Sequence, residues 1–318
     1  QEGGNSDKKE ESKDDGKTDN KKEEITGSTE VEGTQKGEGH GSYKETEDGT
    51  ITECPERTGH WAWRHPHQAD GTVTYTELTG AITMDSVDFG YVEEKQVLHD
   101  VTLYANPGQK LAFVGATGAG KSSILNLIGR YYDIQKGRIT IDGVDIKEMS
   151  TDELRGAIGQ VQQDVFVFTG DVASNIRLLN EEITDEQIKN ASKEVNAAHF
   201  IEQMPNQYHE PVSERGSTLS QGQRQLLSFA RTLAVDPKIL VMDEATANID
   251  TETEQLIQKA LETLMEGRTT IMVAHRLSTI QHADNIIVMH KGKIRESGTH
   301  QELLEMDGIY KKLYQLQL

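Results

Sequence analysis

The feature that most constrains this chain is a glycine-rich loop at residues 115–123, whose pattern requires a strand before it and a helix after it. The loop fits G-x-x-x-x-G-K-[ST] at every position. An apolar run at residues 111–114 precedes it, and apolar residues with helical spacing follow. Glycines let a backbone approach phosphate groups closely, and a helix N-terminus adds partial positive charge. The candidate phosphate-binding residues are Gly115, Ala116, Thr117, Gly118, Ala119, Gly120, Lys121, Ser122 and Ser123. Lys121 is expected to reach the β- and γ-phosphates, and Ser122 to hold Mg²⁺.

Apolar residues are distributed unevenly along the 318 residues. Residues 1–59 consist almost entirely of charged and small polar residues, so we predict a disordered, low-complexity acidic leader that cannot bury enough apolar surface to fold. Residues 60–80 form an aromatic and histidine-containing linker. Residues 81–318 are long enough to build a substantial core and are expected to form the folded domain.

Composition also argues against several classes of protein. The net charge is −20 and no cluster of Lys and Arg is present, which argues against a nucleic-acid partner. Cys54 is the single cysteine, so no internal disulfide framework is possible. No apolar run approaches the about 18 residues of a membrane-spanning helix, and Gln1 begins no signal peptide. The chain as given is therefore expected to be soluble.

Several potential metal ligands gather before residue 68. They are His40, Cys54, His60, His65 and His67. Their spacing matches no closed tetrahedral site, so metal binding stays an alternative to a short docking or linker segment, which is the default interpretation.

The patterning after residue 81 predicts an α/β domain. Alternating or continuous apolar runs predict strands near 82–89, 97–103, 138–141, 158–161, 239–242 and 269–273, and a closing hairpin at 286–294. Asp142-Gly143 is a hairpin-turn signal, and Ser150 with Glu153 and Thr184 with Gln187 are capping boxes. A helical insert is expected at about 166–233, and one terminal amphipathic helix is expected to run from Leu303 to Leu316.

Two strands end in polar residues that suit phosphate chemistry. Asp243 and Glu244 follow the run at 239–242, and His275 follows the run at 269–273. Ligands bind at the carboxyl ends of strands in open α/β sheets. Asp243 is therefore expected to approach Mg²⁺, Glu244 to orient a water and His275 to contact a γ-phosphate oxygen. Tyr91, at a strand end, is a better candidate than Phe89 for stacking on a purine.

A second loop-to-helix transition occurs at Ser220, Gln221, Gly222 and Gln223. A Ser and a Gly at a helix start can present a hydroxyl and N–H groups to an anion, and an ordinary N-cap is the alternative reading.

Together and in this order, these motifs make residues 81–318 resemble the nucleotide-binding domain of ATP-binding cassette exporters. The resemblance implies a phosphate-loop ATPase core with an antiparallel β subdomain and a helical insert. It identifies Tyr91 as the adenine-stacking aromatic, Gln163 as the Q-loop glutamine and 214–216 as the exporter-type contact loop. It also makes 219–223 the signature, Asp243 and Glu244 the Walker B acids, 247–250 the D-loop and His275 the switch histidine.

The resemblance implies Mg²⁺-dependent hydrolysis of ATP in a head-to-tail pair of such domains. Glu244, His275 and Lys121 would be catalytic, Ser122, Gln163 and Asp243 would hold Mg²⁺, and the signature would face the partner's ATP. Hydrolysis would power export through a membrane domain that this chain does not contain, at the cytoplasmic face of the cell membrane. Gln221 and Ala247 depart from the usual Gly and Ser, which resembles one half of a bacterial heterodimeric multidrug exporter.

Two alternatives remain at this point. One is a regulatory subunit that dimerises on ATP with little turnover, favoured by Gln221 and by the missing membrane segment. The other is a soluble cassette ATPase of DNA repair or translation, which the acidic charge and the 214–216 loop disfavour.

Overall fold

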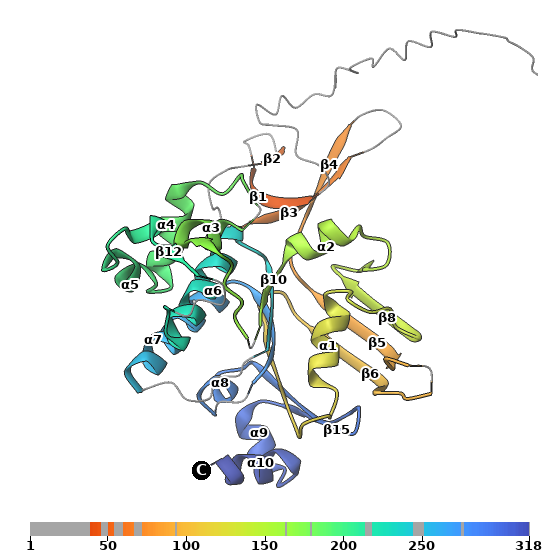
Figure 1. Ribbon diagram of the computed structural model, residues 1–318. Helices are drawn as coiled ribbons and strands as arrows, with labels where there is room; N and C mark the ends of the chain where they lie inside the picture. Colours follow the sequence, from red (N-terminus) through yellow and green to blue (C-terminus); the bar gives the residue numbers. More distant parts are fainter. Residues whose placement is uncertain are drawn as a thin grey trace, which may run out of the picture.

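A mostly parallel sheet runs through the middle of the molecule (Figure 1). The computed structural model describes residues 39–45, 50–53, 60–66, 72–92, 94–162, 164–178, 180–213, 218–243, 251–274 and 277–317. Within these residues the sheet has the strand order β10-β13-β14-β7-β15-β16, in which only β16 is antiparallel to its neighbour. Its strands are β7 (Lys110–Val114), β10 (Ile158–Val161), β13 (Ile239–Asp243), β14 (Thr269–Val273), β15 (Asn285–His290) and β16 (Lys293–Gly298).

The strands β7, β13, β14 and β15 are buried on both faces, which explains why they are nearly continuous apolar runs. Successive side chains of β7 alternate between two cores. Leu111 and Phe113 belong to the core that also contains α1 (Lys121–Ile128) and α2 (Thr151–Ala157), whereas Ala112 and Val114 belong to the core on the opposite face. That opposite face is covered by α6 (Gln221–Val235) and α7 (Thr251–Met265) (Figure 1).

An antiparallel sheet of order β6-β5-β8-β9 packs beside α1. Its strands are β5 (Ile82–Phe89), β6 (Leu98–Ala105), β8 (Lys136–Ile141) and β9 (Val144–Asp145). The predicted hairpin turn is present, with Asp142 and Gly143 both at positive φ between β8 and β9. The sequence-based prediction of a P-loop core with an antiparallel β subdomain is therefore confirmed.

Short helices occupy most of residues 172–209. They are α3 (Val172–Arg177), α4 (Asp185–Glu194), α5 (Ala198–Glu202) and η1 (Gln207–His209), with the strand pair β11 (Gly170–Asp171) and β12 (Pro211–Val212).

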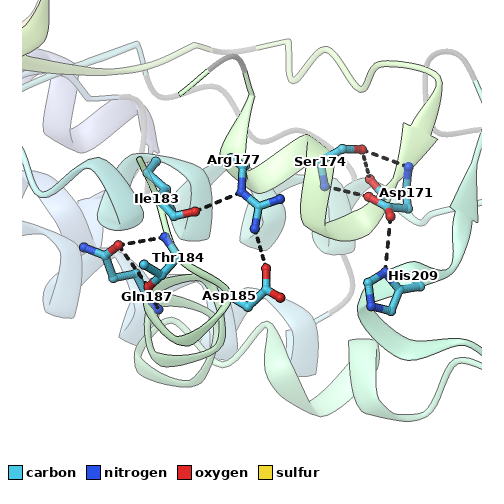
Figure 2. Close-up of polar contacts among 8 residues, drawn as sticks. All are labelled: Asp171, Ser174, Arg177, Ile183, Thr184, Asp185, Gln187 and His209. Carbon is cyan, nitrogen blue, oxygen red and sulfur yellow. Dashed lines mark hydrogen bonds and ion pairs between the residues drawn. The ribbon is translucent and has the colours of Figure 1, made fainter. Parts of the chain in front are cut away.

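Local polar contacts hold the helical insert together, and Figure 2 shows them. Thr184 and Gln187 form the predicted capping box of α4, and Asp171 caps α3 by accepting from the Ser174 N–H. Arg177 donates to the carbonyl of Ile183 (2.9 Å) and pairs with an aspartate of the first turn of α4. Arg177 thus connects α3 to α4, so that these short helices do not depend on helix propensity alone.

The N-terminal part of the chain differs from expectation. Residues 39–53 fall within the expected disordered leader, yet they supply β1 (Gly39–Glu45) and β2 (Ile51–Glu53). With β3 (Trp61–Pro66) and β4 (Val73–Glu77) they form an antiparallel sheet of order β2-β1-β3-β4, here called the accessory sheet. The physical reason is that β3 is anchored by Trp61 and Trp63, which are buried in the core beside α1 and α2, and β3 then pairs with β1.

The C-terminal helix is divided, contrary to the prediction of one helix. The elements are α9 (His300–Glu305) and α10 (Ile309–Gln317), and Asp307 between them has a φ of 53°. The Glu296 carboxylate accepts hydrogen bonds from the N–H groups of Ile309 and Tyr310, which satisfies the start of the second helix. The remaining short helix is α8 (Leu277–Gln281). Among the described residues, no helix combines the length and the apolar character needed to cross a bilayer.

Candidate functional site

The glycine-rich loop connects β7 to α1, as predicted, and two of its glycines are required by its shape. Gly115 has a φ of 145°, and a Cβ there would lie 2.2 Å from the carbonyl oxygen of Met289 on β15. Gly120 has a φ of 101° and precedes α1, and a Cβ there would lie 2.6 Å from Leu98 Cδ2. Both ends of the loop are therefore tightly packed, and a larger residue at Gly115 or Gly120 would displace the backbone.

Lys121 begins α1 and turns its ammonium group back into the loop. Its Nζ donates to the carbonyl oxygens of Gly115 (2.7 Å) and Ala116 (3.0 Å), and the residue is only 7% exposed. Burial lowers the pKa of Lys121, while the charge of Asp243 opposes that effect. The Lys121 ammonium group therefore lies at the loop, where it can donate to phosphate oxygens in place of these two carbonyl oxygens.

Ser122 and Asp243 come together across the sheet. The Ser122 hydroxyl donates to Asp243 Oδ2 at 2.9 Å, although 121 residues separate them. Asp243 ends β13, which is paired with β14, which in turn is paired with β7. The parallel register therefore brings the end of β13 to the edge that carries the loop. A hydroxyl and a carboxylate at this distance are two oxygen donors of the kind that Mg²⁺ takes in proteins.

Tyr91 lies next to the loop, 48% exposed. Its hydroxyl and the Ser123 hydroxyl are 3.0 Å apart and share a hydrogen bond. The Tyr91 ring makes edge contacts with Phe89 (4.9 Å between centroids, 77° between planes) and with Tyr132 (4.9 Å, 89°). Phe89 is buried, as predicted. Tyr132, which the sequence reasoning did not single out, helps to fix the orientation of the Tyr91 ring.

The second loop-to-helix transition has the predicted cap. Ser220 accepts from the Gln223 N–H (3.1 Å) and Gln223 Oε1 accepts from the Ser220 N–H (2.9 Å), so the two residues form a capping box at the start of α6. Gln221 is exposed. Gly222 is buried, and a Cβ there would lie 2.2 Å from Thr253 Cγ2 on α7. This close approach of α6 to α7 has no signal in the sequence beyond the glycine itself.

Several predicted site residues lie outside the described residues. They are Gln163, the contact loop at 214–216, Glu244, the D-loop at 247–250 and His275. Among the predicted site residues that the structure describes, contacts bring together Lys121, Ser122, Ser123, Asp243 and Tyr91. Ser220–Gln223 bond within their own helix turn.

The alternative metal site before residue 68 receives no support from the described residues, among which no group of three or more His, Cys, Asp or Glu side chains is arranged to hold an ion. Of its candidate ligands, Cys54 and His67 lie outside that part of the chain. His60 instead lies against the ring of Tyr43, with 5.7 Å between centroids.

Residues 98–247 match the family model described as ABC transporter. The chain carries the ATP-binding domain of an ABC transporter. It is 52% identical over 238 residues to "Probable multidrug resistance ABC transporter ATP-binding/permease protein YheH" of Bacillus subtilis, a match that covers 75% of this chain and 35% of that protein. It is also 49% identical over 241 residues to the uncharacterized ABC transporter ATP-binding protein YknV of the same organism (76% and 40%).

A solved structure of a bacterial Atm1-family ABC exporter with ATP bound is similar, with a TM-score of 0.71 and 40% sequence identity. That match covers 75% of this chain and 42% of the exporter chain. The ATP-binding domains of ABC transporters are ATPases, and this chain carries such a domain. The chain spans well under half the length of these relatives.

Proposed function

We propose that the chain binds ATP with Mg²⁺, hydrolyses it within a head-to-tail pair of ATP-binding domains, and thereby powers export through a membrane-spanning partner domain. The observation that carries the proposal is the convergence of Lys121, Ser122 and Asp243 at the carboxyl edge of the central sheet. These residues supply a cation for phosphate oxygens and two oxygen donors for Mg²⁺, which is the charge arrangement that phosphoryl transfer requires.

In this proposal the other predicted residues complete the site. Gln163 joins Ser122 and Asp243 in holding Mg²⁺, which when bound would neutralise charge on the β- and γ-phosphates. Glu244 orients the attacking water, and His275 with Lys121 stabilises the charge that develops on the transferred group. Tyr91 offers its half-exposed ring, already oriented by Phe89 and Tyr132, to the adenine base.

The partner domain enters through the start of α6. Ser220 and Gln223 form the capping box of α6. We assign the remaining N–H groups of the first turn of α6 to the ATP of a second ATP-binding domain. Gln221 adds an exposed side chain where the family usually has glycine. This substitution supports a heterodimer, in which this signature serves the weaker of two sites.

A membrane-spanning partner is supported by the relatives and by one surface feature. YheH is named as an ATP-binding/permease protein, and it is far longer than the segment matched here. Phe166 and Phe168 are both about half exposed and make an edge contact with each other at 4.8 Å, at the start of the helical insert. Paired exposed aromatic side chains are typical of a protein–protein contact.

ATP hydrolysis measured against the concentration of the purified chain tests this proposal. If two copies of this chain build each site, Mg²⁺-dependent turnover should rise faster than linearly with chain concentration. If the site needs a different partner chain, turnover should appear only when the partner's ATP-binding domain is added. Glu244→Gln should retain ATP binding and lose turnover, whereas Glu262→Gln, at an exposed position of α7, should retain both. Full hydrolysis by Glu244→Gln would contradict the assignment.

A second candidate, an ATP-binding regulatory subunit, is favoured by the exposed Gln221 at the signature. It predicts intact ATP binding with no turnover at any chain concentration. Adding the ATP-binding domain of a candidate partner chain separates the two functions, because only the heterodimeric ATPase gains turnover from it.

A further inference from the structure

The accessory sheet contacts the connection between α6 and β13. We call residues 236–238, which follow the last residue of α6 and precede the first of β13, the α6–β13 joint. Trp61, the first residue of β3, is 5% exposed, and its indole Nε1 donates a 2.7 Å hydrogen bond to the carbonyl oxygen of Asp236. Trp61 is therefore inserted against a turn that belongs to a part of the chain 175 residues away.

Two cations of this region face the same indole ring. Lys238 Nζ lies 4.4 Å from the centroid of a Trp61 ring, and Arg268 Cζ lies 5.9 Å from it. Arg268 is buried, donates to the Pro237 carbonyl (2.9 Å) and pairs with the Asp236 carboxylate. Trp61 thus donates a hydrogen bond to the joint through its N–H and is attracted to Lys238 and Arg268 by cation–π contacts over its ring.

The accessory sheet is itself held firmly, so Trp61 is a fixed support for the joint. The Asp142 carboxylate, in the turn between β8 and β9, accepts from the N–H groups of Thr79 (2.9 Å), Gly80 (3.2 Å) and Ala81 (2.8 Å) just after β4. The Leu78 N–H also donates to the Trp61 carbonyl (2.6 Å). The start of β3 lies beside the end of β4, so the contact of Trp61 with the joint and the contacts of residues 79–81 with Asp142 lie at the same end of the sheet.

The α6–β13 joint connects two parts of the candidate site. α6 begins after Ser220 and ends at the joint, and β13 begins after the joint and ends at Asp243. Since α6 has 15 residues and a helix rises about 1.5 Å per residue, the helix is about 22 Å long. A small rotation at the joint is consequently magnified at the signature end, while β13 stays fixed within the central sheet.

We propose that Trp61 is a positioning residue for ATP hydrolysis. It fixes the angle between α6 and β13 at the α6–β13 joint. Through Trp61 the accessory sheet controls the turnover rate without contacting the nucleotide. The proposal rests on the proposed roles of Ser220–Gln223 and Asp243. It assigns a function to the accessory sheet, whose four strands all lie outside the matched family segment at 98–247.

Trp61→Phe tests the proposal, because it keeps an aromatic ring between the cations but removes the donor to Asp236. The matched control is Trp63→Phe, which makes the same change two residues along β3 in the same hydrophobic core. We expect Trp61→Phe to leave the Kd for ATP unchanged and to lower kcat about tenfold, which corresponds to about 1.4 kcal/mol. Trp63→Phe should leave both values near those of the parent chain. A structural defect alone would instead lower the active fraction of both variants.

A second measurement, independent of turnover, is hydrogen exchange of the backbone amides of α6 in the same 318-residue chains without nucleotide. We expect faster exchange in α6 for Trp61→Phe than for Trp63→Phe, with β13 unchanged. Equal exchange in the two variants, or equal kcat values, would overturn the role of Trp61. A parent chain that stays inactive even when the partner's ATP-binding domain is added would instead refute the proposed function, and the exchange data would still decide whether Trp61 controls α6.

Discussion

The Ser122 hydroxyl donates a 2.9 Å hydrogen bond to Asp243 Oδ2, and this contact joins the start of α1 to the end of β13. These two oxygens are candidate Mg²⁺ ligands, and in this structure they are hydrogen-bonded to each other. Binding of Mg²⁺ with ATP at this place would replace an existing polar contact, so the site needs little rearrangement to accept the ion.

Removing either oxygen donor should weaken the effect of Mg²⁺ on ATP binding. We expect Ser122→Ala and Asp243→Asn each to reduce the gain in ATP affinity produced by Mg²⁺ by about tenfold, or about 1.4 kcal/mol. Calorimetric titration with ATP, with and without Mg²⁺, measures this gain. Ser297→Ala, which removes a hydroxyl bonded to Asn285 far along the chain, is the control. An unchanged Mg²⁺ effect in both site variants would exclude them as ligands.

Gly115→Ala should abolish ATP binding and destabilise the fold. The added Cβ would lie 2.2 Å from a backbone carbonyl of β15, and neither backbone can move without disturbing the central sheet. Gly108→Ala is a suitable control, since Gly108 also has a positive φ but its Cβ would meet open space. The control should lose about 1–2 kcal/mol from backbone strain alone. Urea unfolding of both variants measures the difference, and equal losses would show that the contact with β15 is not limiting.

Local sequence signals were sufficient for the central part of the fold. The loop at Gly115–Ser123, the apolar run of β13 and the Asp142-Gly143 turn each carry a strong short-range pattern, and each is found in the structure where the pattern placed it. Asp243 also lies next to Ser122 of the loop, because the carboxyl ends of parallel strands share one edge.

The accessory sheet was not predicted, because its strands depend on a distant anchor. Residues 39–45 are polar and carry little strand propensity, and their partner strand β3 begins at Trp61, whose indole is bonded to the distant Asp236 carbonyl. The same limit applies to Thr253, whose contact with Gly222 depends on how α6 crosses α7. Long-range packing of this kind has no periodic signature in a single sequence.

Lys121 should impose a pH dependence on the stability of the nucleotide-free chain. Burial lowers the pKa of its ammonium below the ordinary value of 10.5, so the folded state holds this proton less tightly than the unfolded state does. The destabilisation is fully present below the lowered pKa and is lost as the pH rises through 10.5, above which both states are neutral.

The free energy of unfolding of the parent chain should therefore rise relative to that of Lys121→Met as the pH approaches 10.5. Urea unfolding at a series of alkaline pH values measures the difference. Lys136→Met removes the same charge from an exposed position of β8 and serves as the control. Parallel pH dependences for parent and Lys121→Met would contradict the effect of burial.

Gly222 should have two separable roles, one in packing and one in the proposed signature. Gly222→Ala places a Cβ 2.2 Å from Thr253 Cγ2 and should destabilise the chain by about 1–3 kcal/mol through overpacking between α6 and α7. Adding Thr253→Ser removes that methyl group and should restore most of the lost stability, which thermal unfolding measures.

If Gly222 also allows close approach to the partner's ATP, the Gly222→Ala, Thr253→Ser double variant should fold normally and still hydrolyse ATP slowly. Thr253→Ser alone is the control for the loss of the methyl group. Full recovery of turnover together with stability would restrict Gly222 to its packing role, since the relief of one steric contact would then account for both effects. If the double variant does not recover stability, the loss in Gly222→Ala comes from a contact other than the one with the Thr253 methyl group.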